Sequence, residues 1–216
     1  VGPVEVGEHG DGDDDGGPTI TMSQQVVEFS TGDPLPDVEV CVFGRNGDYC
    51  GVTDAAGQVS ITAPADRDVT ISYFREGYFP VLVQTHTPNT DWVVPDDGYL
   101  LDEVSVELAW ATVVPRIEDD KGHFMFTVFD GPVMADASHV AGVAVSTTPD
   151  SGGAIAYMGA NAMMDDAMTA TDHRGAGAIA NMRPGTYTLT LAHPTLTCHA
   201  MYGHPGDQPN TFVVDI

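Results

Sequence analysis

A short pattern that occurs twice constrains the fold of this chain more than any other feature. Residues 53–57 read Thr-Asp-Ala-Ala-Gly, and residues 171–175 read Thr-Asp-His-Arg-Gly. In such a turn the aspartate accepts hydrogen bonds from backbone amides, and the glycine takes the positive φ that other residues avoid. A strand with period-two alternation follows each turn; in the second copy Tyr187, Leu189 and Leu191 alternate with threonines. The repeated pattern therefore predicts an all-β chain with two domains.

The charge of the chain excludes several kinds of partner. Its 216 residues include 32 acidic and 7 basic residues, for a formal net charge of −25. Such a surface repels nucleic acid and anionic lipid headgroups, but it suits cation binding or a salty medium. No apolar run approaches the length of a membrane span. Because the sequence opens at Val1 without methionine or signal peptide, we expect a processed, exported protein, extracellular or at the cell surface.

The three cysteines are Cys41, Cys50 and Cys198. The first two flank Gly-Arg-Asn-Gly, residues 44–47, in a predicted β-hairpin. A two-residue Asn-Gly turn would set the two cysteines diagonal to each other, which is far for a disulfide. A four-residue loop would place them directly opposite. We favour a Cys41–Cys50 disulfide, because the other features indicate an oxidising compartment, and this leaves Cys198 unpaired.

Residues 1–18 form an acidic, glycine-rich segment. Asp11, Asp13 and Asp15, with the glycine that follows, match the start of an EF-hand calcium loop. The twelfth loop position, however, is Met22 rather than glutamate. We therefore favour a flexible tether and keep calcium binding as the alternative. The segment resembles the spacer behind the lipid anchor of a bacterial surface lipoprotein, although the anchor cysteine is absent. Such an anchor is the only membrane link that we expect.

Residues 19–94 carry several motifs in a set order. Residues 34–40 read Pro-Leu-Pro-Asp-Val-Glu-Val, the Thr-Asp turn follows, and residues 77–80 read Gly-Tyr-Phe-Pro. This order resembles the carboxypeptidase regulatory-like domain, a small transthyretin-like Greek-key β-sandwich, although Arg67-Asp68 departs from the family's Gly-x-Tyr element. The resemblance implies an accessory fold without catalysis. We expect the strands at residues 20–29, 38–43, 58–62, 68–74 and 81–84.

Residues 95–121 connect the two domains. Apolar residues lie at helical spacing over residues 98–111, with aspartates before them and Pro115 after them. This spacing predicts a short linking helix. Residues 104–110 alternate equally well as a strand, and that alternative stays open.

Residues 122–216 repeat the plan of the first domain with additions. Residues 140–145 read Val-Ala-Gly-Val-Ala-Val and residues 184–187 read Pro-Gly-Thr-Tyr, which again resembles the regulatory-like domain. Thr-Leu-Thr-Cys, residues 195–198, stands in place of the Gly-Tyr-x-Pro element. The longer spacing before the second Thr-Asp turn indicates an insertion over residues 149–168. We expect the first two strands at residues 122–129 and 140–146.

Histidine, cysteine and methionine residues gather near the C-terminal end of the sequence. Such soft and borderline ligands suit copper or zinc. The candidates are His193, Cys198, His199, Met201 and His204. Because Cys198 and His199 are adjacent, they point to opposite faces of a strand and do not easily share a metal. We favour a small buried thiol at Cys198 and keep metal binding as the alternative.

A methionine-rich run occupies residues 158–168. Such a run can bind copper(I) or offer an adaptable contact surface, but more often its methionines fill the core beneath an insertion.

No group of residues predicts catalysis. The side chains of the adjacent pairs Asp119-Asp120 and Asp165-Asp166 diverge, and Ser138-His139 lacks a third partner. We therefore expect no enzyme, and no cofactor apart from copper, zinc or calcium in the alternatives above.

The preferred hypothesis is a non-enzymatic exported β-sandwich protein that serves as a surface binding, adhesion or structural module. Its partner would be an unknown protein or glycan ligand, or copies of itself, with residues 1–6 adding a strand to the next copy. The alternative is a copper- or zinc-binding protein that uses its second domain.

Overall fold

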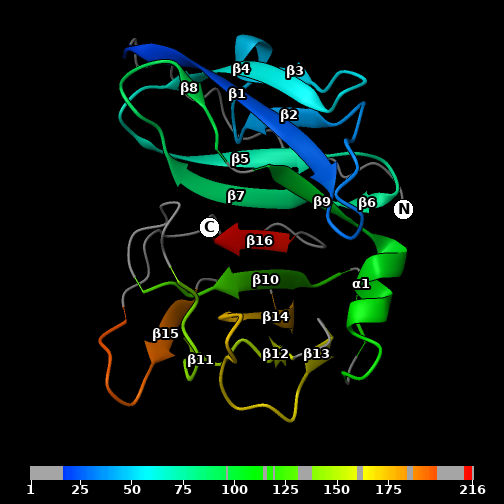
Figure 1. Cartoon of the computed structure of the whole chain (residues 1–216), viewed down its shortest axis with the longest axis vertical. Coiled ribbons are helices and arrows are strands. Elements are labelled where there is room, and N and C mark those ends of the chain that lie inside the picture. Colours follow the sequence, from blue (N-terminus) through cyan, green and yellow to red (C-terminus); the bar gives the residue numbers. More distant parts are fainter. Residues whose placement is uncertain are drawn as a thin grey trace. The chain divides into compact units, whose positions relative to one another are not determined.

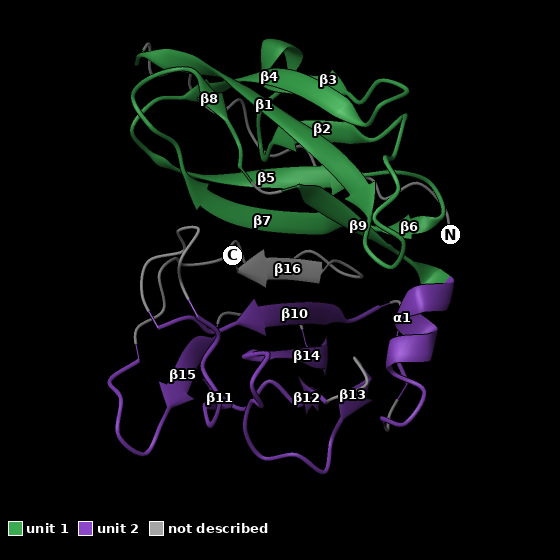
Figure 2. Cartoon of the chain, viewed as in Figure 1, with its two compact units in different colours: residues 1–103 green, residues 104–216 purple. Residues whose placement is uncertain are grey.

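The computed structural model describes residues 17–95, 97–113, 116–118, 120–130, 138–159, 163–183, 187–198 and 212–215, the last of these as backbone only. The chain forms two compact units, residues 1–103 and residues 104–216 (Figure 2). The predicted all-β class is confirmed, because among the described residues only α1 (Glu103–Ala109) and the 3-10 turn η1 (Gly47–Tyr49) are helical. Neither has the length and apolar character that crossing a membrane requires.

Unit 1 contains two sheets (Figure 1). The first has the order β4-β1-β9-β6, with β8 beside β1. In the second, β5 lies between β7 and β2, and β3 forms a hairpin with β2. The strands are β1 (Thr19–Glu28), β2 (Glu39–Val42), β3 (Cys50–Val52), β4 (Gln58–Pro64), β5 (Asp68–Phe74), β6 (Tyr78–Phe79), β7 (Val81–His86), β8 (Trp92–Val93) and β9 (Gly98–Asp102). Alternate residues of β1, β4 and β5 are buried, as the sequence pattern predicts, so one face of each of these strands contributes to the core.

Unit 2 also contains two described sheets. In the larger sheet, β14 lies between β12 and β10, with β13 beyond β12 and β16 beyond β10; β11 and β15 form the smaller sheet. The strands are β10 (Gly122–Thr127), β11 (Ala144–Thr148), β12 (Ala154–Met158), β13 (Met164–Asp165), β14 (Ala176–Met182), β15 (Thr188–Ala192) and β16 (Phe212–Asp215). Tyr157 links the two sheets, because its ring packs edge-on against Phe126 and its hydroxyl accepts a 2.9 Å hydrogen bond from the N–H of Val145. The predicted insertion at residues 149–168 supplies β12 and β13.

The two Thr-Asp-x-x-Gly turns have the same geometry. One carboxylate oxygen of Asp54 accepts a 2.8 Å hydrogen bond from the amide two residues further on, and Asp172 does the same at 2.8 Å. Gly57 and Gly175 have φ values of +71° and +63°. The carbonyl of Gly57 accepts a hydrogen bond from the N–H of Val26 on β1, and the carbonyl of Gly175 accepts one from the N–H of Val128, directly after β10. The expected roles of aspartate and glycine are therefore confirmed.

The threonine that opens each turn has a role that the sequence did not indicate. The buried Oγ1 of Thr53 accepts a 2.9 Å hydrogen bond from the N–H of Val38 and donates a 2.7 Å bond to the carbonyl of Leu35. Thr171 makes the equivalent pair of bonds, at 3.0 and 2.8 Å, in unit 2. The hydroxyl thus ties the turn to the segment before the second strand. In unit 2 this segment is held by Thr171, so β11 starts at Ala144 rather than at residue 140.

The expected linking helix is confirmed over residues 103–109, which form α1, but its predicted first part is wrong. Residues 98–102, predicted as helix, form β9, because Leu100 and Leu101 are both buried and residues 98–100 pair in parallel with the end of β1. A helix could not bury two successive side chains on opposite sides in this way. The alternative strand over residues 104–110 is also wrong, because α1 covers Glu103–Ala109. Val106 and Trp110 are buried four residues apart, whereas Val104 and Leu108 are exposed.

We expect Glu28 at the end of β1 to make stability sensitive to acid. Burial by itself would raise the pKa of its carboxyl, but hydrogen bonds from Thr31 and Ser30 outweigh burial and lower the pKa from 4.5 to about 2. The charged form is thus favoured in the fold, so its contribution is complete above pH 4.5 and is lost as the pH falls towards 2. Urea midpoints of the parent and Glu28→Gln should therefore differ most above pH 4.5 and converge near pH 2. A difference that does not change with pH would contradict this account.

Candidate functional site

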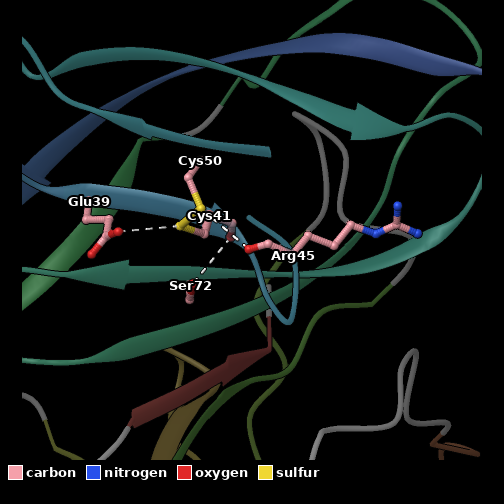
Figure 3. The surroundings of a disulfide bond; sticks show 5 residues. All are labelled: Glu39, Cys41, Arg45, Cys50 and Ser72. Carbon is pink, nitrogen blue, oxygen red and sulfur yellow. Dashed lines mark hydrogen bonds between the residues drawn. A yellow bond between two sulfur atoms is a disulfide. The ribbon is translucent and has the colours of Figure 1, made fainter. Parts of the chain in front are cut away.

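The hairpin of β2 and β3 carries the predicted disulfide, which is confirmed (Figure 3). Cys41 and Cys50 are directly opposite in the strand register, with Cα atoms 4.1 Å apart. Neither predicted turn length is right, because residues 43–49 connect the strands and include η1, but the register is the one that the four-residue loop predicted. Gly44 and Gly47 have positive φ in this connection, which explains why the sequence places glycines there.

A carboxylate and a carbonyl lie beside the two sulfurs. Glu39 Oε1 is 3.9 Å from Cys41 Sγ, and the carbonyl oxygen of Arg45 is 3.5 Å from Cys50 Sγ (Figure 3). Sulfurs that are bonded to each other carry no hydrogen, so both are contacts rather than hydrogen bonds. The guanidinium of Arg45 lies over the ring of Tyr49, 4.8 Å from its centroid.

The disulfide belongs to a solvent-facing surface that we name the hairpin face. It spans β3, β2 and β5 and consists of two cross-strand rows, Val52–Glu39–Phe74 and Cys50–Cys41–Ser72. Val52 is 62% and Phe74 38% exposed, and Glu39 between them is also exposed. Directly paired residues share a face of the sheet, so two apolar side chains flank a single carboxylate beside the disulfide. Sequence reasoning found the disulfide but not this face, because the face depends on pairing between β2 and β5.

The structure describes two of the five residues in the predicted copper or zinc site. His193 is half-buried, and its Nδ1 accepts hydrogen bonds from the N–H groups of Thr195 at 3.2 Å and Leu196 at 3.0 Å. Cys198 is free, as expected, but it is half-buried rather than the buried thiol that the sequence favoured. The described residues do not bring these two side chains together in a group of ligands. Metal binding here stays a prediction.

The other members of that site, His199, Met201 and His204, lie outside the described residues. The same holds for the predicted calcium ligands, Asp11, Asp13 and Asp15, and for the proposed donor segment, residues 1–6.

The methionine-rich run contributes to the core of unit 2. Met164 on β13 is 4% exposed, and Met168 packs against the buried cluster around Phe126 and Ile179. The hydroxyl of Thr112 donates a 2.9 Å hydrogen bond to the carbonyl of Met164. For these two methionines the structure therefore supports the core interpretation rather than a binding role.

Sequence reasoning missed an exposed histidine that lies between two carboxylates. His86 on β7 pairs in register with Asp68 on β5, and its Nδ1 is 2.7 Å from Asp68 Oδ1. Its Nε2 is 3.5 Å from Asp66 Oδ1. The hydrogen bond that His86 donates to Asp68, and then the one to Asp66, raise the pKa of its imidazole. Only the strand pairing brings these groups together, so no local sequence signal could have found them.

No protein-family model matches the sequence, and no curated protein matches it significantly. The resemblance to carboxypeptidase regulatory-like domains therefore stays a prediction. Among solved structures the chain is similar to the Bacillus anthracis TIE protein, with 11% identity and a TM-score of 0.31 over 91% of this chain and 33% of that one. It is also similar to a streptococcal ancillary pilin, with 14% identity and a TM-score of 0.26 over 91% of this chain and 61% of that one.

A third similar structure is a shaft pilin from Lactobacillus rhamnosus GG, with 10% identity and a TM-score of 0.25 over 91% of this chain and 95% of that one. The chain thus spans a third of the first of these proteins and 61% of the second. Likenesses at this level do not indicate a function.

We expect the oxidised chain to contain one free thiol. The unreduced, denatured protein should take up one thiol-reactive tag by intact mass, because Cys41 and Cys50 are bonded and Cys198 is free. Reduction before labelling should raise the number to three, since the chain has three cysteines. The Cys198→Ser variant should take up no tag until it is reduced. Three tags on the unreduced parent would contradict the assignment.

Proposed function

We propose that this chain is a non-enzymatic, exported β-sandwich protein that acts at the cell surface as a binding, adhesion or structural module. The observation that carries the proposal is the Cys41–Cys50 disulfide, which closes a half-exposed hairpin. Disulfides of this kind persist in oxidising compartments outside the cytosol. Export is therefore the simplest reason for a covalent bond at this edge of the sheet.

The hairpin face is the surface that we propose for contact with a partner. The exposed side chains of Val52 and Phe74 lie on either side of Glu39 in one cross-strand row. Exposed apolar residues are usually scattered singly over a surface. The net charge of −25 disfavours nucleic acid and anionic lipid. A protein that offers apolar and basic side chains suits this face better than a glycan or a second, equally acidic copy.

Three described histidines have carboxylate or hydroxyl contacts but not the full set of a hydrolytic triad. His86 on β7 and His173 in the second Thr-Asp-x-x-Gly turn contact carboxylates, but their described contacts include no hydroxyl or thiol nucleophile. His193 contacts the hydroxyl of Thr195 and lacks an orienting carboxylate among its described contacts. A hydrolytic triad needs a nucleophile, a histidine base and an orienting carboxylate that are linked by hydrogen bonds.

Two experiments test the proposal. Antibody should label the protein on intact cells that produce it, and protease added to those cells should remove the label. A photo-cross-linking residue at Val52 should then capture a partner on those cells. The matched control is the same residue at Val93, a 77% exposed valine of β8 on the other sheet of unit 1. Label only after lysis would contradict export, and equal capture at both valines would contradict a role of the hairpin face.

A further inference from the structure

Among the described residues, Glu39, Cys41 and Cys50 form a group of three metal-ligand types whose donor atoms all lie within 4.8 Å of one another. The two sulfurs are bonded to each other, so neither is free to bind a metal as a thiolate. We infer that reduction of this disulfide opens a site for one thiophilic divalent cation, with zinc as the natural candidate. This site is separate from the residues of unit 2 that the sequence suggested for metal binding.

The hairpin already places the three ligands on one surface (Figure 3). Cys41 and Cys50 are directly opposite, and Glu39 lies two residues before Cys41 on the same face of β2. Glu39 Oε1 is 3.9 Å from Cys41 Sγ. Two thiolates held tetrahedrally by zinc at about 2.3 Å are about 3.8 Å apart, and a bound carboxylate oxygen lies slightly closer to each. Rotation of the cysteine side chains reaches this separation while the strands stay paired.

The chemistry requires an external reductant, which we take to be a dithiol. The dithiol gives two electrons and two protons to the Cys41–Cys50 bond, which becomes two thiols, and is itself oxidised to a disulfide. The cation then displaces both thiol protons to water and binds two thiolates and the Glu39 carboxylate. A water completes the four-coordinate arrangement, as in zinc sites with three protein ligands and one open position.

The ligand types and the surroundings determine which ion binds. Thiolates select zinc and similar soft ions, whereas calcium and magnesium require oxygen ligands. The cysteines are half-exposed and Glu39 is exposed, so reductant and ion can both reach the site. The net charge of −25 raises the concentration of divalent cations near the surface.

Cadmium is the probe for the test, because its bond to thiolate gives a charge-transfer band in the ultraviolet. The full chain is reduced with a dithiol, freed of the reductant without oxygen, and titrated with cadmium. We expect one cadmium per chain and no band in the oxidised protein. The matched control Cys198→Ser removes the third cysteine and should keep the band. Cys41→Ser should abolish it, and Glu39→Gln should weaken binding at least about tenfold.

Several outcomes would overturn the inference. A band of equal strength in the oxidised protein, or its loss in Cys198→Ser, would place the metal elsewhere. Unchanged affinity in Glu39→Gln would remove the carboxylate from the site. Far-ultraviolet circular dichroism follows the fold during the titration, and unfolding on reduction that cadmium does not reverse would also overturn it.

Discussion

Replacing Gly57 with alanine will lower the free energy of unfolding of unit 1 by about 4 kcal/mol, near the upper end for single substitutions. A Cβ at this position would lie 2.5 Å from the carbonyl oxygen of Val26 and 3.1 Å from the amide nitrogen of Leu35. Both atoms belong to backbone that cannot rotate away, and the φ of +71° adds the usual penalty for a side chain. Urea unfolding, followed by the fluorescence of Trp92 in a Trp110→Phe background, measures the change in the free energy of unfolding of unit 1.

Gly32 provides the matched control for this prediction. Its φ of +72° is nearly the same, but no atom lies within 4 Å of the position of its Cβ. Gly32→Ala should therefore lower the free energy of unfolding only by the penalty for a side chain at positive φ, about 1–2 kcal/mol. Gly175→Ala in the second turn should repeat the large effect in unit 2, because its Cβ would lie 2.6 Å from the carbonyl oxygen of Val128. If Gly57→Ala and Gly32→Ala lower the free energy of unfolding equally, the close approach of the backbone at Gly57 does not contribute.

Replacing Asn181 with alanine will destabilise unit 2 by about 3 kcal/mol, because two part-buried hydrogen bonds are lost and alanine is disfavoured at a positive φ. Asn181 is 5% exposed with a φ of +62°. Its Oδ1 accepts a 2.9 Å hydrogen bond from the N–H of Glu118, and its Nδ2 donates a 2.6 Å bond to the carbonyl of Arg116. The side chain thus holds residues 116–118 against β14. Urea unfolding followed through Trp110, in a Trp92→Phe background, measures the loss.

Two further substitutions separate the contributions of Asn181. Asn181→Gly permits the positive φ and loses only the side-chain bonds, so it should cost about 1 kcal/mol less than alanine. Asn181→Asp keeps the acceptor for Glu118 but places a carboxylate oxygen beside the carbonyl of Arg116, and it should be at least as harmful as glycine. A glycine variant as stable as the parent would mean that residues 116–118 do not depend on this side chain.

The sequence predicted the parts of the fold whose cause lies within a few neighbouring residues. The turns at residues 53–57 and 171–175 are predictable because the aspartate accepts a hydrogen bond from a nearby backbone amide and the glycine adopts the positive φ. The strand at residues 68–74 is predictable because its apolar and polar residues alternate, which indicates one buried face. The Cys41–Cys50 bond followed from spacing together with the oxidising compartment that other features of the sequence indicated.

Features that depend on pairing between residues far apart in the sequence were decided only by the tertiary structure. Residues 98–102 have apolar residues that fit a helix, yet they form β9 because residues 98–100 pair in parallel with the end of β1 and so satisfy backbone groups there. The hairpin face exists because β5 brings Phe74 beside Glu39, and the Asn181 contact exists because β14 passes residues 116–118. Local propensities are weak compared with the burial and hydrogen bonding that such pairings provide. The sequence by itself therefore determined the turns and the alternating strands, and packing determined β9 and the surfaces.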